Sequence, residues 1–129
     1  MSSALLLIKP LRRPRLWAAL WAAAVLLVIV VCLIPPPPIP LPENSDKGEH
    51  FLAYFILTGS AVQLFRRGRP LLWVGAGLVV MGIGIEFAQG ALTEDRMADP
   101  MDAIANTIGV LAGMATALTP LRDLLLRWR

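Results

Sequence analysis

Residues 16–34 read LWAALWAAAVLLVIVVCLI, a run of 19 residues without a charged side chain. At a rise of about 1.5 Å per residue, a helix of this length spans a hydrocarbon core of about 30 Å. A cleaved signal peptide is the alternative, because basic residues precede the run. The run is longer than such a peptide needs, however, and no Ala-x-Ala-like site follows it. The run therefore predicts a retained transmembrane helix.

The composition of the whole chain also favours lipid as its solvent. Of 129 residues, 57% are hydrophobic and 16% are charged, and the apolar residues come in blocks. The net charge of +3 could suit a nucleic acid, but the basic residues lie beside the apolar blocks, which indicates membrane topology and no nucleic-acid partner. Cys32 is the single cysteine, so no intrachain disulfide can form, and we expect it to be a packing residue.

Three more helices are predicted after the first. Prolines in segment 35–45 end the first helix, because proline lacks an amide donor, and should form a stiff outer loop. Ser45 or Asp46 is a suitable N-cap for the next helix. The expected spans are about 46–65, 70–92 and 101–118, between a basic N-terminus over 1–15 and a basic tail over 122–129. The predicted fold class is all-α, an integral membrane four-helix bundle.

The distribution of basic residues predicts the orientation of this bundle. Ten fall on one side: Lys9, Arg12, Arg13, Arg15, Arg66, Arg67, Arg69, Arg122, Arg127 and Arg129. Only Lys47 and Arg96 fall on the other side. Because basic residues are retained in the cytoplasm, we expect both termini to be cytoplasmic. The tryptophans also lie toward the basic ends, as interfacial anchors do: Trp17, Trp21, Trp73 and Trp128.

Each of the last three helices carries a stripe of polar and small residues at helical spacing. The stripes contain Asp46, Lys47, His50, Tyr54 and Thr58 on the second helix, Gly75, Gly82, Glu86 and Gln89 on the third, and Asp102, Asn106, Gly109 and Gly113 on the fourth. Polar side chains avoid lipid by pairing inside a bundle, so these stripes should face one another. The first helix offers no such stripe and should serve as an anchor.

Glu86 is the most informative member of these stripes. It lies six residues before Leu92, about 9 Å from the outer end of its helix. An ionisable residue at that depth is a functional-site candidate, although a polar network that only fixes the helix register would also account for it. His50 with Glu86 or Asp102 could act as acid and base. The carboxylates could hold a divalent cation, but no other cofactor is predicted.

The ordered set of motifs resembles the VanZ-like family of bacterial membrane proteins. The motifs are Asp46-Lys47-x-x-His50-Phe51-x-x-Tyr54, Glu86-x-x-Gln89, and Arg96 followed by Asp102, Asn106, Gly109 and Gly113. The resemblance implies a VanZ-like domain over 46–121 in a bacterial inner membrane, with binding residues Asp46, Lys47, His50, Tyr54, Glu86, Gln89, Arg96, Asp102 and Asn106. The sequence departs from the family after Arg96, where Met97 and Ala98 stand in place of a frequent aromatic residue.

Two functions agree with these observations. The family takes its name from a member associated with teicoplanin resistance, which favours an envelope protein whose outward polar pocket binds a lipoglycopeptide or a lipid head group. The alternative is an intramembrane enzyme that acts on a lipid-linked envelope substrate through His50, Glu86 and Asp102. The expected partners are membrane lipids, the amphiphilic ligand and further copies of the chain. A proton-coupled transporter would require such oligomers, because four helices without an internal repeat are too few.

Overall fold

The computed structural model describes residues 6–34, 45–92 and 100–128, apart from the side chains of residues 45–47, 92 and 128. The elements are α1 (Pro14–Leu33), α2 (Ser45–Leu64), α3 (Arg69–Leu92), α4 (Pro100–Ala115), the 3₁₀ turns η2 (Thr116–Leu118) and η3 (Pro120–Asp123), and α5 (Leu124–Trp128). Within these ranges the fold is all-helical, and extended backbone pairs only at an isolated bridge between Ile8 and Phe65. The prediction of an all-α fold is therefore confirmed.

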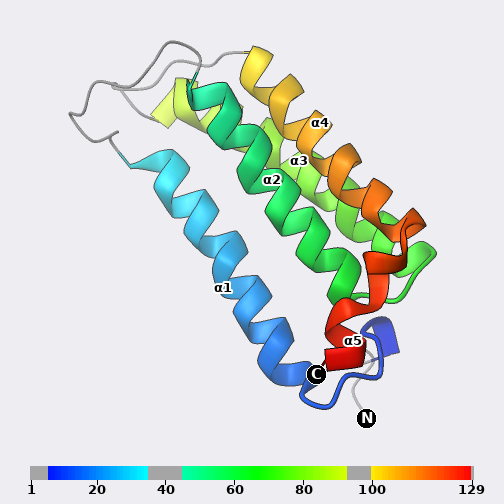
Figure 1. The fold of residues 1–129 in the computed structure, drawn as a ribbon. Coiled ribbons are helices and arrows are strands. Elements are labelled where there is room, and N and C mark those ends of the chain that lie inside the picture. Colours follow the sequence, from blue (N-terminus) through cyan, green and yellow to red (C-terminus); the bar gives the residue numbers. More distant parts are fainter. Residues whose placement is uncertain (1–5, 35–44, 93–99, 129) are drawn as a thin grey trace.

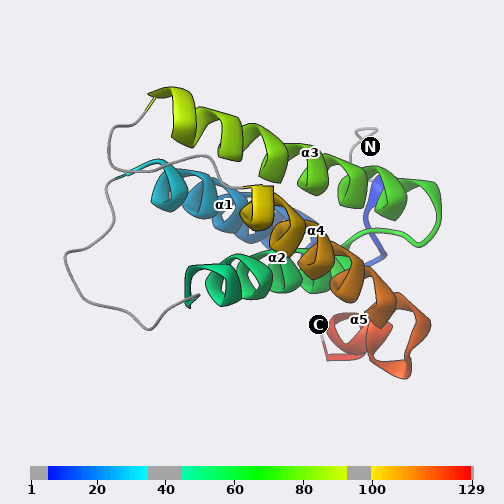
Figure 2. The same cartoon turned by 90° about the horizontal axis from the view of Figure 1, so that it is seen from above.

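The four long helices alternate in direction along the chain (Figure 1). Seen from above, α4 lies over the space between α2 and α3, and α1 packs against the same two helices from the other side (Figure 2). The predicted helix boundaries agree with the observed ones within a few residues. The main difference concerns the fourth helix, whose α-helical part ends at Ala115 and tightens into a 3₁₀ turn through Leu118.

Three stretches of the described residues are long and apolar enough to cross a membrane: Pro14–Leu33, Arg69–Ala91 and Pro100–Leu118. No residue of α1 is buried within the protein. Large apolar side chains cover the outward faces of α1, α3 and α4: Leu20, Leu26, Leu27, Val30, Leu72, Val80, Ile83, Phe87, Ile104, Ile108 and Leu111. A soluble protein rarely exposes so large an apolar surface, which fits contact with lipid.

The remaining long helix, α2, corresponds to the predicted span 46–65, but its composition is not apolar enough to identify it as a membrane span. Its length of 20 residues equals that of α1, whereas its first turns carry charged residues that lower its hydropathy. It is also the most internal helix, with Tyr54, Leu57 and Ala61 almost completely buried. Because its neighbours cover it, α2 needs less apolar surface than a helix that faces lipid on several sides.

Two glycines of α4 allow its backbone to touch α2. A Cβ atom on Gly109 would lie 2.5 Å from the carbonyl oxygen of Phe51, and one on Gly113 would lie 2.6 Å from Cβ of Thr58. Both distances are shorter than any ordinary contact, so only glycine fits at either position. This is the small-xxx-small packing that the sequence indicated, and it makes α2 and α4 the most extensively packed pair.

The N-terminal segment packs against the end of α2 where the basic residues gather. Ile8 and Leu11 are buried beside Leu64. The ammonium group of Lys9 donates to the carbonyl oxygens of Val62 and Arg122, both at 2.7 Å, and to Oδ1 of Asp123 at 2.9 Å. The start of α1, the turn between α2 and α3 and the end of α4 all lie at this end (Figure 1). We call it the basic end.

We expect Gly109→Ala and Gly113→Ala each to destabilise the protein by about 1–3 kcal/mol, because the added methyl group overpacks the contact between α2 and α4. Gly84→Ala is the matched control, since a Cβ at Gly84 meets nothing within 4 Å. The measurement is the free energy of unfolding in mixed micelles. Equal effects of all three substitutions would contradict the close approach.

The hydrogen bond from Lys9 holds the pKa of the Asp123 carboxyl below its ordinary value. The stabilisation from this pair is therefore complete above about pH 4, the ordinary carboxyl pKa, and is lost as the pH falls through the lowered pKa. Because Asp123 is partly exposed, we expect no more than about 1 kcal/mol. Wild type should unfold at a higher temperature than Asp123→Asn at pH 7, and the gap should close at low pH. A gap that persists under acid conditions would argue against this pair.

Candidate functional site

A buried polar cluster lies where α2 and α4 begin, at the opposite end from the basic end. His50 comes from α2, and Asp102 and Asn106 come from the first two turns of α4. The Nδ1 atom of His50 lies 2.9 Å from Oδ1 of Asn106, and Nε2 lies 3.8 Å from Oδ2 of Asp102. The side chains of His50 and Asp102 are each 10% exposed. The predicted convergence of two stripes is therefore present here.

The partners of His50 determine the orientation of its ring. Because Oδ1 of Asn106 can only accept a hydrogen bond, Nδ1 of His50 donates the proton. The neutral ring then carries its lone pair on Nε2, on the side of Asp102. At 3.8 Å, Nε2 and the carboxylate oxygen are too far apart for a hydrogen bond, so Asn106 is the partner that orients the ring.

The third helix meets the cluster at Gly82 and reaches α1 through Gln89. A Cβ at Gly82 would lie 3.1 Å from Nδ2 of Asn106, so the absence of a side chain lets α3 pack against this amide. Gln89 is 2% exposed and donates from Nε2 to the carbonyl oxygen of Cys32 at 2.7 Å. That carbonyl belongs to the last turn of α1, where intrahelical donors are lacking. Gln89 thus caps α1. The first helix therefore makes a polar contact with α3, whereas we expected it to serve only as a membrane anchor.

Three further polar side chains lie deeper between the helices. Glu86, Tyr54 and Thr58 are 6%, 1% and 0% exposed. The hydroxyl groups of Tyr54 and Thr58 have no hydrogen-bond partner among the described residues. A buried hydroxyl without a partner costs about 1–3 kcal/mol, which favours a site where a polar group of another molecule can bind.

A cavity of about 260 Å³ lies beside this cluster, between α1 and α2. Its volume is near the lower limit of about 300–1,000 Å³ for small-molecule sites. The α2 wall contains Ala53 and three residues with polar groups, Glu49, His50 and Tyr54. The α1 wall is mainly apolar and contains Leu27, Val28, Val31 and Cys32. The cavity therefore offers polar and apolar contacts on opposite sides. We call it the upper cavity.

The predicted site residues divide into three groups. His50 and Tyr54 line the upper cavity, and the other described members lie outside its lining: Glu86, Gln89, Asp102 and Asn106. Asp46 and Lys47 belong to the first turn of α2, but their side chains are outside the described residues, as is all of Arg96. The sequence prediction missed Glu49, which lines the cavity. Its position in the first turns of α2, next to His50, was the available signal.

The described part of the chain contains no group of three or more His, Cys, Asp or Glu side chains that could hold a metal ion. The pairing of His50 with Asp102 brings only two such groups together. A calcium site takes about six to eight oxygen ligands, several of them from carboxylates and carbonyl groups of the protein. The predicted alternative of a bound divalent cation therefore gains no support from the described side chains.

Comparison of the chain with protein-family models, with curated proteins and with solved structures gives no match. A helical bundle hosts many unrelated functions, so the fold alone does not indicate one. The function must be argued from the chemistry of the polar cluster and the upper cavity.

We expect Asn106→Ala to destabilise the protein by about 1–3 kcal/mol, because it leaves the Nδ1 donor of His50 without its acceptor. In the His50→Ala background the same substitution should cost at least about 0.5 kcal/mol less, since the donor is already absent. A double-mutant cycle of unfolding free energies in mixed micelles measures this coupling. Thr107→Val is the control, because Thr107 bonds to Ala103 of its own helix. Additive effects of the His50 and Asn106 substitutions would contradict the pairing.

Proposed function

We propose that this chain is a VanZ-like protein of a bacterial inner membrane, whose outward polar site binds an amphiphilic ligand at the cell envelope. The ligand is a lipoglycopeptide or the head group of a lipid. The observation that carries the proposal is the upper cavity, which has Glu49, His50 and Tyr54 on one wall and apolar residues of α1 on the other. The two walls suit a molecule with a polar part joined to a hydrocarbon part.

The orientation in this proposal rests on the charge distribution. The described basic residues gather at the basic end, together with the start of α1 and the end of α4. With all four long helices in the bilayer, the positive-inside rule puts the basic end in the cytoplasm. The upper cavity then faces the outer leaflet, where an extracellular glycopeptide or a lipid-linked envelope precursor is available.

The buried hydroxyl of Tyr54 supports binding of a polar group. It is 1% exposed and has no hydrogen-bond partner within the described residues, although it belongs to a residue that lines the upper cavity. The oxygen of a sugar hydroxyl, an amide or a phosphate could accept a hydrogen bond from it and remove the cost of burial. His50, which lies 3.8 Å from the carboxylate of Asp102, lines the same cavity and offers a second polar group there.

Expression of the chain in a susceptible host tests the proposal. We expect wild type to raise the inhibitory concentration of teicoplanin, and His50→Ala and Glu86→Gln to abolish the increase at equal protein levels. His50→Ala removes a side chain of the cavity wall, and Glu86→Gln replaces a buried carboxyl group with an amide of similar size. Thr107→Val should preserve the increase, because Thr107 lies outside the cavity lining. Unchanged tolerance for wild type and for every variant would count against the proposal.

An intramembrane enzyme is the second candidate, and the geometry of His50 favours it. Asn106 fixes Nδ1, and Nε2 faces the carboxylate of Asp102, an arrangement that could hold and release a proton. Glu86 would supply a second carboxyl group in this role. Incubation of the purified protein with a lipid-linked peptidoglycan precursor distinguishes the two candidates. Turnover that His50→Ala and Asp102→Asn abolish would favour the enzyme, and saturable binding without turnover would favour the ligand-binding protein.

A further inference from the structure

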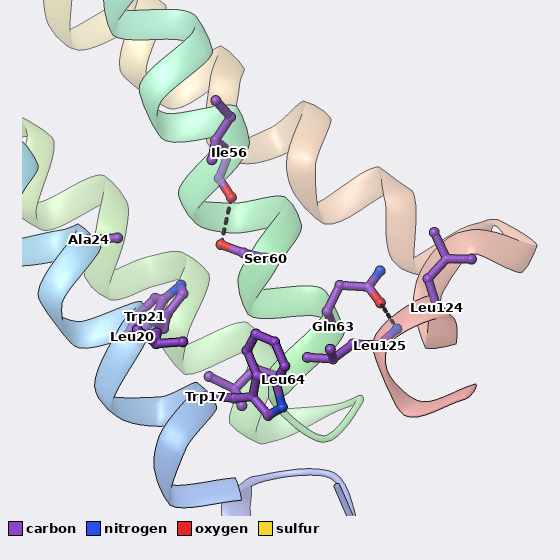
Figure 3. A pocket seen from close by; sticks show the side chains of 10 residues that line it. All are labelled: Trp17, Leu20, Trp21, Ala24, Ile56, Ser60, Gln63, Leu64, Leu124 and Leu125. Carbon is purple, nitrogen blue, oxygen red and sulfur yellow. Dashed lines mark hydrogen bonds between the residues drawn. The ribbon is translucent and has the colours of Figure 1, made fainter. Parts of the chain in front are cut away.

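A second and larger hollow lies at the basic end of the bundle. Its volume is about 770 Å³, within the range of about 300–1,000 Å³ for small-molecule sites. The floor is the outer face of α2, with Ile56, Ser60 and Gln63 at helical spacing. One wall belongs to α1 and the other to α5, whose Leu125 lies across from Trp17 (Figure 3). We call this hollow the lower groove.

The polar side chains that line the lower groove make their hydrogen bonds within the protein. The Ser60 hydroxyl donates to carbonyl oxygens of its own helix, at 2.6 Å to Ile56 and 3.0 Å to Leu57. The indole N–H of Trp21 donates to the carbonyl of Leu57 at 2.9 Å. These donors are therefore used, and a ligand in the groove meets a surface that is effectively hydrocarbon.

Gln63 uses both ends of its amide to hold the α5 wall in place. Its Nε2 donates to the carbonyl of Leu121 at 2.7 Å, and its Oε1 accepts from the backbone N–H of Leu125 at 2.9 Å. The ion pair between Lys9 and Asp123 fixes the turn that precedes α5. Hydrogen bonds and an ion pair thus hold the α5 wall of the groove in place. The shape of the groove therefore does not depend on exposed apolar side chains alone.

Positive charge flanks the lower groove at the basic end. Arg13 precedes α1 by one residue and lies one turn before Trp17, and Arg127 lies one turn after Leu124. Both are exposed and lie outside the lining of the groove. Arg127 donates from Nη2 to the carbonyl oxygen of Pro120 at 2.6 Å, and neither arginine forms an ion pair among the described residues. Asp123 is the one acidic residue of the described basic end, and its single charge interacts with Lys9, Arg122 and Arg127 together, so this end keeps a net positive charge. An anion at the mouth of the groove would therefore meet uncompensated positive charge.

We propose that the lower groove binds one anionic phospholipid, with an acyl chain along α2 and the head-group phosphate beside Arg13 and Arg127. The apolar lining of the groove suits the acyl chain of the lipid. The two arginines would make the groove prefer a lipid with a negatively charged head group. Basic residues at the ends of transmembrane helices commonly recognise such head groups. The inference shares with the proposed function only the premise that the helices lie in a bilayer.

Native mass spectrometry of the full chain, purified in detergent and mixed with equal amounts of phosphatidylglycerol and phosphatidylcholine, tests the proposal. We expect one bound phosphatidylglycerol, preferred over phosphatidylcholine by about fivefold or more. The double variant Arg13→Gln, Arg127→Gln should lose the preference and still retain phosphatidylcholine. Arg69→Gln is the matched control, since Arg69 is equally exposed but lines a different hollow. Equal retention of the two lipids by wild type would overturn the charge argument.

Two groove-filling variants test the location. Ala24→Phe and Ser60→Leu each place a larger side chain in the groove and should lower the retention of both lipids severalfold. Ala23→Phe is the control, because Ala23 is exposed on α1 and does not line the groove. Wild-type retention by a folded filling variant, or an equal loss in Ala23→Phe, would overturn the location. Because the readout does not involve teicoplanin, this proposal and the proposed function can fail independently.

Discussion

The close approach of α2 and α4 is the constraint on which the rest of the site depends. Gly109 and Gly113 bring the α4 backbone onto the carbonyl of Phe51 and the side chain of Thr58. With larger residues the two helices would separate, and the hydrogen bond of 2.9 Å between His50 and Asn106 would not form. In lipid, where hydrophobic burial does little to hold helices together, such backbone contact and the polar pairs that it permits supply much of the association energy.

The polar residues of the bundle serve two different purposes. Gln89 satisfies a carbonyl at the end of α1, and Asn106 orients the ring of His50, so both act mainly on the structure. His50, Glu49 and Tyr54 instead line a cavity. The two groups lie next to each other because both are near helix ends. Helix ends leave backbone groups unpaired, and polar side chains are tolerated at that depth in a membrane. The structural network therefore positions the residues that a ligand would contact.

The two ends of the bundle differ in charge and in construction. At one end His50 and Asp102 lie beside the small upper cavity, which has a polar wall. At the other end Lys9 joins the N-terminal segment, the end of α2 and the turn before α5. This clamp fixes the α5 wall of the lower groove. A basic side chain at this end thus also shapes an apolar surface between the helices.

The sequence by itself determined the helices, their approximate ends and the polar stripes, because the length of apolar runs and the 3.6-residue period are local properties. Only the tertiary structure decided which polar side chains contact one another across the helices. The indole of Trp21 donates to the carbonyl of Leu57 in α2, and Gln89 reaches the backbone of α1. Glu49 lines the cavity, while Asp102 lies behind His50. These contacts depend on the rotation of each helix about its own axis and on its register against its neighbours, which no single helix encodes.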